Sequence, residues 1–476
     1  MRTAHSVETV RAAERDLMAR LPEGALMQRA AAGLAAACAG LLGRVYGARV
    51  VLLVGPGDNG GDALYAGARL ARRGARVSAL PMDPQRMHPG GLRALRAAGG
   101  RVVDRMPDGR ADLVLDGLLG IGGHGGLRPA AAGLADGAAA ARAAGARVVA
   151  VDLPSGVDAD TGEVAGPAVA ADVTVTFGAY KPGLLVDPGA GRAGAVRLVD
   201  IGLSFPGPPV LETLRHADVA ARLPVPGAAS DKYRRGVVGV AAGSARYPGA
   251  AVLAVAGALR GGAGAVRYVG PAGAEVLARY PESLVHGGPP GKAGRVQAWV
   301  VGPGLGEGRG EVAELLDADV PLLIDADGLR GLDPQALRAR AAPTLLTPHA
   351  GEAAALLGVA RTEVESARLA SVRELAGRFG AAVLLKGSTT LVAGPGESPV
   401  RVNPTGTPWL ATAGSGDVLS GLAGGLLAAG LGVVDAGSVA AYVHGLAGRY
   451  AARSAPATAH EVALALPAAW RDTLTS

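Results

Sequence analysis

The residues best placed to do chemistry in the second half of the chain lie in one glycine-rich segment. In Ala413-Gly-Ser-Gly416, the two glycines (Gly414 and Gly416) precede an apolar stretch that predicts a helix, and Asp417 falls in its first turn. Free N–H groups at a helix start bind phosphate or a developing negative charge. A carboxylate there is costly unless it has a function, such as activating a hydroxyl group. The alternative is that Asp417 only complements the helix N-terminus.

Three other predicted strands of this half also end in polar residues. Lys386 ends AAVLLKG and is followed by three hydroxyl side chains, Ser388, Thr389 and Thr390. A cation, N–H groups and hydroxyls at one strand end suit the phosphate or ribose of a nucleotide. His349 follows another strand in LLTPHAGE, where a single histidine is more often structural, and LLIDADGL ends in Asp325 and Asp327.

The first half contains a glycine loop that invites a misleading interpretation. Gly55-Pro-Gly-Asp-Asn-Gly60 matches the G-x-G-x-x-G pattern of dinucleotide binding, and Asp83 follows the next strand. However, Pro56 removes one N–H group, and Asp58 and Asp62 put carboxylates where a pyrophosphate would lie. Together with Asn59, they favour a site for hydroxyls, an amide or a cation. The alternative is that Asp62 only favours a helix N-terminus.

Carboxylates follow two later strands of the first half as well. Asp116 precedes a glycine-rich loop in DLVLDGLLGIGGHGG, and VVAVDLPSG contains Asp152 and Ser155. A single aspartate at a strand end is often only a turn or a cap. Because parallel strands bring their carboxyl ends to one edge, however, we expect Asp62, Asp116 and Asp152 to converge.

The elements that must position these residues alternate regularly between strand and helix. Residues 7–42 predict helices broken at Pro22 and Gly24; apolar runs predict strands at 49–55 and 75–80, and a helix is expected over 61–74. Strand–helix alternation predicts parallel sheets covered on both faces. Proline-rich stretches around residue 215 place a domain boundary there, giving domains 1–215 and 216–476. We therefore expect two three-layer α/β domains in the 476-residue chain.

Composition excludes several other classes of protein. With 49% hydrophobic and 18% charged residues, the chain is expected to fold into globular domains. The single cysteine, Cys38, allows no internal disulfide and is expected to be buried. A net charge of +6 with 3% aromatic residues argues against nucleic-acid binding. The N-terminal charges and the lack of a long apolar run predict a cytoplasmic protein without membrane contact.

Four motifs of the first half, in order, resemble the hydrated-nicotinamide (NAD(P)HX) epimerase domain, a Rossmann-like fold. They are GPGDNGGDALYAGARLARRG, DGLLGIGGHGGL, VVAVDLPSGVDADTG and VTFGAYKPGLL, the last containing Lys181. The resemblance implies that Asp152 contacts the substrate and transfers a proton, and that Asn59, Asp116 and Ser155 coordinate K⁺. It also implies substrate binding by two segments, with the residues Asn59, Gly60, Gly61, Asp62, Gly120, Gly122, Gly123 and Gly126. The chain departs from the family pattern at Asp58 and Ala63, where Asn and Gly are usual.

The second half is similar to the ribokinase-like superfamily, and within it to ADP/ATP-dependent NAD(P)HX dehydratases. The motifs are SDKYRRGVVGVAAGSARYPGAAVLA, VVGPGLG, PLLIDADGL, LLTPHAGE, LLKGSTT, NPTGTPWLATAGSGDVLSG and AAYVHGLAG. The resemblance implies hydrate contact by Ala250 or Ala251, Gly306, His349 and Asp417. It implies nucleotide contact by Lys386, Gly387, Ser388, Thr389, Thr390, Gly414 and Gly416.

The sequence therefore predicts a bifunctional repair enzyme of hydrated NADH and NADPH. Its first domain would interconvert the R and S hydrates, and its second would dehydrate the S form with ADP or ATP and Mg²⁺. The family resemblance adds the expectation of a homo-oligomer. Three alternatives remain open: a ribokinase-like kinase of a small alcohol such as a vitamin precursor, a dehydrogenase using residues 55–60, and a first domain that only senses nucleotides or binds a protein.

Overall fold

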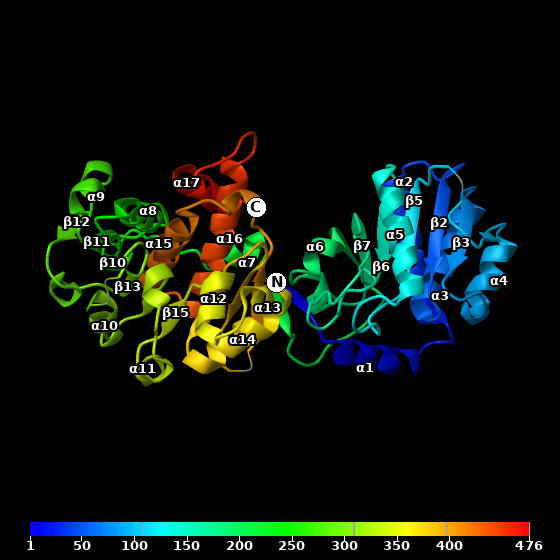
Figure 1. The fold of residues 1–476 in the computed structure, drawn as a ribbon, viewed down its shortest axis with the longest axis horizontal. Coiled ribbons are helices and arrows are strands. Elements are labelled where there is room, and N and C mark those ends of the chain that lie inside the picture. The colour runs from blue at the N-terminus through cyan, green and yellow to red at the C-terminus, as the bar shows by residue number, and fades with distance from the viewer. Residues whose placement is uncertain (108, 308–309, 397, 476) are drawn as a thin grey trace. The chain divides into compact units, whose positions relative to one another are not determined.

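The computed structural model describes residues 1–107, 109–307, 310–396 and 398–475. These form two compact units, Thr3–Val210 and Leu211–Ser476, and residues 1–2 belong to the second. Figure 1 shows strands alternating with helices in each unit. Each unit is described separately below.

The first unit is built on a seven-stranded sheet in which every pair of neighbouring strands is parallel. Its carboxyl edge collects the residues that follow strands β2, β5 and β6, which lie side by side. The strand order across the sheet is β4 (Arg101–Val102), β3 (Arg76–Pro81), β2 (Arg49–Val54), β5 (Leu113–Gly117), β6 (Arg147–Val151), β7 (Val173–Phe177) and β8 (Ala195–Val199).

Alternate side chains of these strands enter two separate apolar layers, as expected when both faces of a sheet are covered. On one face Val50, Leu52 and Val54 pack with helices α2 (Ala25–Leu42), α3 (Asp58–Arg72) and α4 (Pro89–Ala97). On the other face Val51 and Leu53 pack with α5 (Pro129–Ala143). The remaining helical segments are α1 (Val7–Met18), η1 (Pro84–Arg86), η2 (Pro182–Leu184) and α6 (Ala190–Ala193).

Helix α2 is long and apolar enough to cross a membrane, judged by length and composition alone. In the structure one face of it is part of the apolar core, where Leu34 and Cys38 are fully buried. The expected burial of Cys38 is confirmed, and burial raises the pKa of its thiol to about 12. The apolar composition of α2 is therefore explained by packing on the sheet.

Helix α3 begins earlier than the sequence suggested. The predicted start at residue 61 was wrong, because the helix begins at Asp58. Asn59, Gly60 and Gly61 are therefore part of the first helical turn rather than of a loop. The helix ends as expected before Gly74, whose φ of 87° is a conformation that glycine adopts readily.

The second unit contains a mixed sheet that is parallel at its centre. The antiparallel pairs β16–β17 and β17–β18 interrupt it near one side. The order of its strands is β9 (Leu211–Thr213), β18 (Val400–Asn403), β17 (Thr390–Ala393), β16 (Ala382–Leu385), β15 (Thr344–Leu346), β14 (Leu322–Ile324), β13 (Ala298–Val301), β10 (Val237–Ala241), β11 (Ala265–Val269) and β12 (Leu284–His286). The short strand β1 (Arg2–Ala4) lies at the start of the chain.

Helices cover this sheet too. A large apolar cluster joins one set of helices to the strands: α8 (Pro248–Arg260), α15 (Ser415–Ala428), α16 (Val433–Ala451) and α17 (Ala459–Thr475). The other helical segments are α7 (His216–Ala220), α9 (Gly273–Arg279), η3 (Pro290–Lys292), α10 (Gly310–Leu316), η4 (Ala326–Leu329), α11 (Pro334–Ala339), α12 (Ala350–Leu357), α13 (Arg361–Ser366), α14 (Arg368–Phe379) and η5 (Pro408–Leu410). The expected α/β class of both halves is confirmed.

Candidate active sites

A buried ion pair lies at the carboxyl edge of the first sheet. Asp152 directly follows β6, and its Oδ1 accepts hydrogen bonds from Lys181 Nζ at 2.5 Å, Thr176 Oγ1 at 2.9 Å and the Phe177 N–H at 3.2 Å. Lys181 is only 1% exposed. Asp152 Oδ2 makes no hydrogen bond within the described residues, so this oxygen is free to meet a substrate.

The backbone of Asp152 is unusual. Its φ is 66°, in the left-handed region that non-glycine residues rarely adopt. Such conformations cost about 1–3 kcal/mol and cluster at functional sites, where the surrounding structure holds them in place. Here the Asp152 N–H donates to the Val175 carbonyl at 2.8 Å, and the side chain is held by Lys181 and Thr176.

Asp116 and Ser155 form a second buried pair at the same edge. Asp116 is fully buried; its Oδ1 accepts from Ser155 Oγ at 2.6 Å and its Oδ2 from the Ser155 N–H at 2.8 Å. Burial raises the pKa of Asp116 to about 6, although the bonds from Ser155 and the Leu118 N–H lower it. Ser155 Oγ also lies 2.9 Å from the Leu119 N–H and 3.2 Å from the Leu119 carbonyl oxygen.

The first turn of α3 contributes two polar atoms without partners. Asn59 Nδ2 and Asp62 Oδ1 are buried and lack a hydrogen-bond partner in the part of the chain that the structure describes. Burial, followed by the charges of Asp152 and Asp58, raises the pKa of Asp62 well above its usual range. Unsatisfied buried polar atoms are rare in native proteins, so their presence here indicates a binding site.

Helix α1 adds two charged residues that sequence reasoning missed. Burial, then the charge of Asp152, raises the pKa of Glu14, while Lys181 and Arg11 lower it. Arg11 reaches the glycine-rich loop after β5, since a Cβ at Gly122 would lie 2.8 Å from its Nη2. The only sequence signal was their place on an otherwise ordinary amphipathic helix.

The glycines of the predicted substrate loop fall into two groups. Gly120 lies against Asn59, because a Cβ on Gly120 would be 3.2 Å from Asn59 Cγ and Oδ1. A Cβ on Gly126 would lie 3.1 Å from Gly166 Cα, so Gly126 lies against the backbone of Gly166. The Gly123 N–H donates to the Gly120 carbonyl. The loop therefore contacts the Asn59 site at its start and a neighbouring loop at its end.

The G-x-G-x-x-G match has a structural explanation. A Cβ at Gly55 would lie 1.8 Å from the Leu118 carbonyl oxygen, and one at Gly60 would lie 2.2 Å from the Gly55 carbonyl oxygen. Asp83 accepts from the Gln85 N–H at 3.0 Å and caps a short 3₁₀ helix. Close packing of the backbone thus accounts for these two glycines, and a local cap accounts for Asp83.

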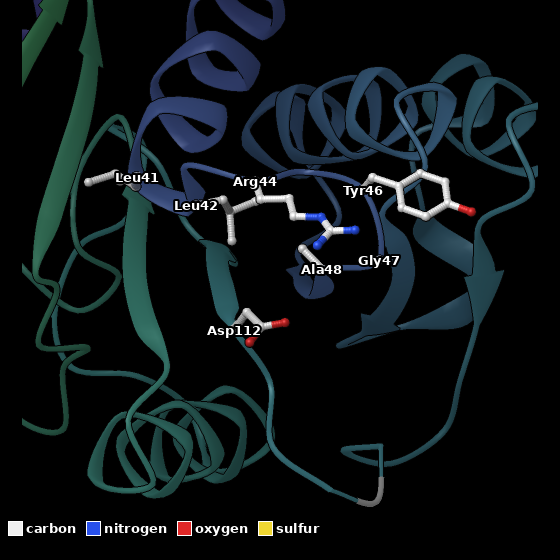
Figure 2. Close-up of a pocket in the computed structure, with 7 residues that line it drawn as sticks. All are labelled: Leu41, Leu42, Arg44, Tyr46, Gly47, Ala48 and Asp112. Carbon is white, nitrogen blue, oxygen red and sulfur yellow. The ribbon is translucent and has the colours of Figure 1, made fainter.

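A cavity of about 500 Å³ lies at the opposite edge of this sheet. Figure 2 shows its lining, in which the Arg44 side chain extends between Leu42 and Tyr46, with Asp112 below it in this view. Its residues precede β2 and β5, whereas Asp116 and Asp152 lie at the carboxyl ends of their strands. This cavity contains none of the predicted site residues.

In the second unit, Lys386 forms the centre of a buried polar cluster. Its Nζ lies 2.6 Å from Asp325 Oδ1 and 3.7 Å from Glu352 Oε2. Asp325 is 1% exposed, and its Oδ2 accepts from Ser420 Oγ at 2.7 Å. Burial alone would lower the pKa of Lys386, but the carboxylates of Asp325 and Glu352 outweigh it and raise that pKa.

Gly416 and Asp417 lie beside this cluster. A Cβ at Gly416 would be 3.4 Å from Lys386 Nζ, so the start of α15 meets the end of β16. Burial, then the charges of Asp325, Asp327 and Glu352, raises the pKa of Asp417 to about 7, against an opposing effect of Lys386. A carboxyl group that titrates near neutral pH suits general acid–base chemistry.

Arg368 supports the loop after β16, and sequence reasoning did not identify it. The side chain is 6% exposed and donates from Nη2 to the carbonyls of Leu385, Lys386 and Thr389. A Cβ at Gly387 would lie 2.3 Å from that nitrogen. Thr389 and Thr390 are buried and Ser388 is exposed. Arg368 thus fixes the shape of the predicted nucleotide loop.

The predicted hydrate contacts border the same edge. His349 caps α12, where its Nδ1 accepts from the Glu352 N–H at 3.1 Å, and its side chain is 59% exposed. The Gly306 N–H donates to Asp327 Oδ2 at 2.9 Å. Ala250 is partly exposed while Ala251 is fully buried, so Ala250 is the one of the two that a ligand can touch.

His444 on α16 is a further buried polar residue near this site. Burial lowers the pKa of its ring to about 4, and its Nε2 has no partner among the residues described. It lies in the AAYVHGLAG motif, close enough to Lys386 for that charge to lower its pKa further. The ring also interacts with the backbone of Ser415 at the start of α15, which partly opposes the lowering of its pKa.

Both halves of the chain match known families. Residues 238–467 match the NAD(P)H-hydrate dehydratase family, and residues 23–183 match the YjeF-related protein N-terminus. The chain is 52% identical over 441 residues to the bifunctional NAD(P)H-hydrate repair enzyme Nnr of Mycobacterium tuberculosis (strain ATCC 25618 / H37Rv), covering 90% of each chain.

The chain belongs to the bifunctional NAD(P)H-hydrate repair enzyme family. It is also 51% identical over 454 residues to the Nnr of Mycobacterium leprae (strain TN), covering 93% of each.

Solved structures agree for the dehydratase half of the repair enzyme. The ADP/ATP-dependent NAD(P)H-hydrate dehydratase of Bacillus subtilis, co-crystallised with ATP/Mg²⁺, matches with a TM-score of 0.50 and 30% identity over 54% of this chain and 97% of its own. A ribokinase-like superfamily protein of Enterococcus faecalis V583 has a TM-score of 0.50 and 23% identity, covering 58% of this chain and 99% of its own. The latter supports the ribokinase-like fold.

Proposed function

We propose that this chain repairs hydrated NADH and NADPH with two active sites. The first unit epimerises the R and S hydrates, and the second dehydrates the S form while ADP is converted to AMP and phosphate. The observation that carries the proposal is the pairing, in one chain, of the Asp152–Lys181 site with the Asp417–Lys386 site. Membership in the repair enzyme family supports it.

Dehydration begins at the hydroxyl group of the hydrate. Asp417, with a pKa raised to about 7, accepts the hydroxyl proton as the oxygen attacks the terminal phosphorus of ADP. The bond from that phosphorus to the bridging oxygen breaks, and AMP leaves. The N–H groups at Gly414–Gly416 and the Lys386 ammonium stabilise the developing charge. Phosphate then leaves the ring carbon, the neighbouring C–H loses its proton, and the dihydronicotinamide is restored.

Epimerisation needs a group that moves protons at the carbon bearing the hydroxyl, beside the ring nitrogen. Asp152 is suited to this task because one of its carboxylate oxygens is held by Lys181 and Thr176 while the other is free. Asn59 Nδ2 and Asp62 Oδ1, both buried without a hydrogen-bond partner in the described ranges, supply contacts for the nucleotide. The loop from Gly120 to Gly126 and the Arg11 guanidinium complete the site.

Two cations fit this scheme. The dehydratase neighbour was crystallised with ATP and Mg²⁺, so we assign the same nucleotide–metal pair to the second site.

In the first unit, Asp116 is a fully buried carboxylate without a described cationic partner, and Ser155 Oγ and the Leu119 carbonyl lie next to it. These oxygen donors, with Asn59 at the adjoining helix start, fit K⁺, which would offset the buried charge. No group of three or more His, Cys, Asp or Glu that could hold a metal is found in the described ranges.

The test is to incubate the protein with hydrated NADH plus ADP, and separately plus ATP. Formation of NADH with stoichiometric AMP or ADP supports the proposal. Formation of a phosphorylated thiazole or pyrimidine alcohol from such substrates, with no NADH from the hydrate, would instead establish a kinase. We further propose a cytoplasmic location and a homo-oligomeric state. Size-exclusion chromatography with light scattering measures the oligomeric state.

A further inference from the structure

A cavity of about 490 Å³ lies in the second unit at a place that the repair reaction does not use. The loop before β10, the end of α8 and the last turns of α17 form its walls. Arg235 in that loop precedes β10, which ends at Ala241, whereas the dehydratase residues follow the carboxyl ends of their strands. The cavity is therefore at the amino edge of the sheet, away from Lys386 and Asp417.

The charged side chains that line this cavity are all positive. Arg235, Arg260 and Arg471 line it, and no aspartate or glutamate is among its lining residues. Arg260 Nε is buried without a hydrogen-bond partner in the described chain. Among the described residues, these three guanidinium groups make a single hydrogen bond, from Arg235 Nη2 to the Gly262 carbonyl at 3.2 Å. Arginines close together without a counter-charge repel one another, and a bound anion would remove that cost.

The rest of the lining is apolar and aromatic. Trp470 is partly exposed in the cavity, next to Gly262, where a Cβ would lie 3.7 Å from its ring. Val225 is 67% exposed and Leu474 is 42% exposed at the same cavity. An indole ring stacks well on a flat aromatic base, and guanidinium groups bind phosphate through paired hydrogen bonds. The volume lies within the range of small-molecule sites.

We infer that this cavity is a second anion site, which binds a nucleoside polyphosphate with its base on Trp470 and its phosphates on Arg260 and Arg471. Three guanidinium groups call for a ligand with at least two negative charges. A nucleoside diphosphate meets this need and supplies the aromatic ring. The inference concerns binding alone and does not depend on the repair activity.

Isothermal titration of the full-length protein with ADP, without hydrate, tests the site. Arg260→Gln/Arg471→Gln should lose one equivalent of bound ADP relative to the wild type, or bind it at least about tenfold more weakly, since two charge-assisted contacts are gone. Arg279→Gln is the matched control: it removes an exposed arginine of the same unit outside the cavity and should leave the stoichiometry unchanged. Equal stoichiometry and affinity in all three proteins would overturn the inference.

Hydrogen exchange of the wild type gives a result that needs no variant. Addition of ADP should protect residues 224–235 and 467–474 as well as the dehydratase site, and protection of the dehydratase site alone would contradict the inference. Pyrophosphate carries the charge of the ligand without its aromatic base, so it tests the arginines alone. It should bind this site of the wild type more weakly than ADP does. Its affinity for Trp470→Leu should equal its affinity for the wild type. Protection of these segments that depends on protein concentration and not on ADP would show that a second copy of the chain covers the cavity instead.

Discussion

Lys181 Nζ lies 2.5 Å from Asp152 Oδ1, and both side chains are buried at the carboxyl edge of the first sheet. The ammonium group also donates to Thr176 Oγ1 and to the Phe177 carbonyl, each at 3.0 Å. Lys181 thus uses all three of its hydrogens within the protein. Its role is to hold one carboxylate oxygen of Asp152 so that the other faces the substrate.

Replacing Lys181 by methionine should leave the Asp152 charge buried without its partner. Loss of one member of a buried pair costs about 3–5 kcal/mol, so Lys181→Met should strongly destabilise the first unit. The double variant Asp152→Asn/Lys181→Met should be more stable than Lys181→Met alone, because it no longer buries an unpaired charge. Calorimetric unfolding of the three proteins measures this difference, and equal stability of the single and double variants would refute the pairing.

Lys181 should also affect the pH profile of epimerisation. Without the ammonium group, the buried carboxylate of Asp152 has no counter-charge, so the pH dependence of epimerisation should differ from that of the wild type. Lys181→Arg should restore part of the wild-type profile since it keeps the charge. A uniform loss of rate with no change in the pH profile would indicate that Lys181 is only structural.

The ionised carboxylate of Asp417 should lower the stability of the protein although dehydration requires it. Its pKa is raised to about 7 in the folded protein, so the stability that its proton provides is fully present below the unfolded pKa near 4 and is lost as pH rises through about 7. The free energy of unfolding of Asp417→Asn should therefore exceed that of the wild type at pH 8 by on the order of 1–4 kcal/mol, with a smaller gain at pH 4. Dehydration should be lost. Asp319→Asn, which removes an exposed carboxylate, should change neither the stability nor the rate of dehydration.

The rate of dehydration should rise with pH through about 7. If Asp417 accepts the hydroxyl proton, only its ionised form is active, and kcat/KM for the S hydrate should increase across its pKa and then level off. The profile is measured at saturating ADP and fixed ionic strength. A rate that falls as pH rises through 7 would mean that Asp417 acts in its protonated form.

Potassium should act on epimerisation alone. Ser155→Ala removes the hydroxyl that lies 2.6 Å from Asp116 Oδ1, so the K⁺ concentration needed for half-maximal epimerisation should rise by about tenfold or more. Dehydration of the S hydrate by the same protein should be unchanged, which provides an internal control. A wild-type epimerisation rate that is the same in Na⁺ and in K⁺ would remove the cation from the scheme.

The sequence was sufficient to predict the strand ends and therefore the edge at which the sites form. Asp116, Asp152, Lys386 and Asp325 each stand at or just after a buried apolar run, and the structure places each of them at the carboxyl edge of a sheet. The start of α3 was misjudged because the glycines after Asp58 disfavour a helix locally, although the packing of Gly60 against Gly55 requires them.

The pairings inside the sites were not visible in the sequence. Lys181 and Asp152 are separated by 29 residues, and Lys386 and Asp325 by 61, so only the folded sheet shows which carboxylate each lysine neutralises. Glu14 comes from a helix whose pattern carried no sign of a site. Arg368 resembled any other helical arginine until the structure showed its bonds to three loop carbonyls.

The most direct test starts from the purified R hydrate of NADH with ADP and follows NADH and AMP together. The account predicts that the wild type forms NADH with one AMP for each NADH. Asp152→Ala should form NADH only at the rate of spontaneous epimerisation, and Asp417→Ala should accumulate the S hydrate without forming NADH or AMP. Mixing the two variants should restore turnover. NADH formation by Asp152→Ala at the wild-type rate, or no recovery in the mixture of two folded variants, would contradict the account of two independent sites.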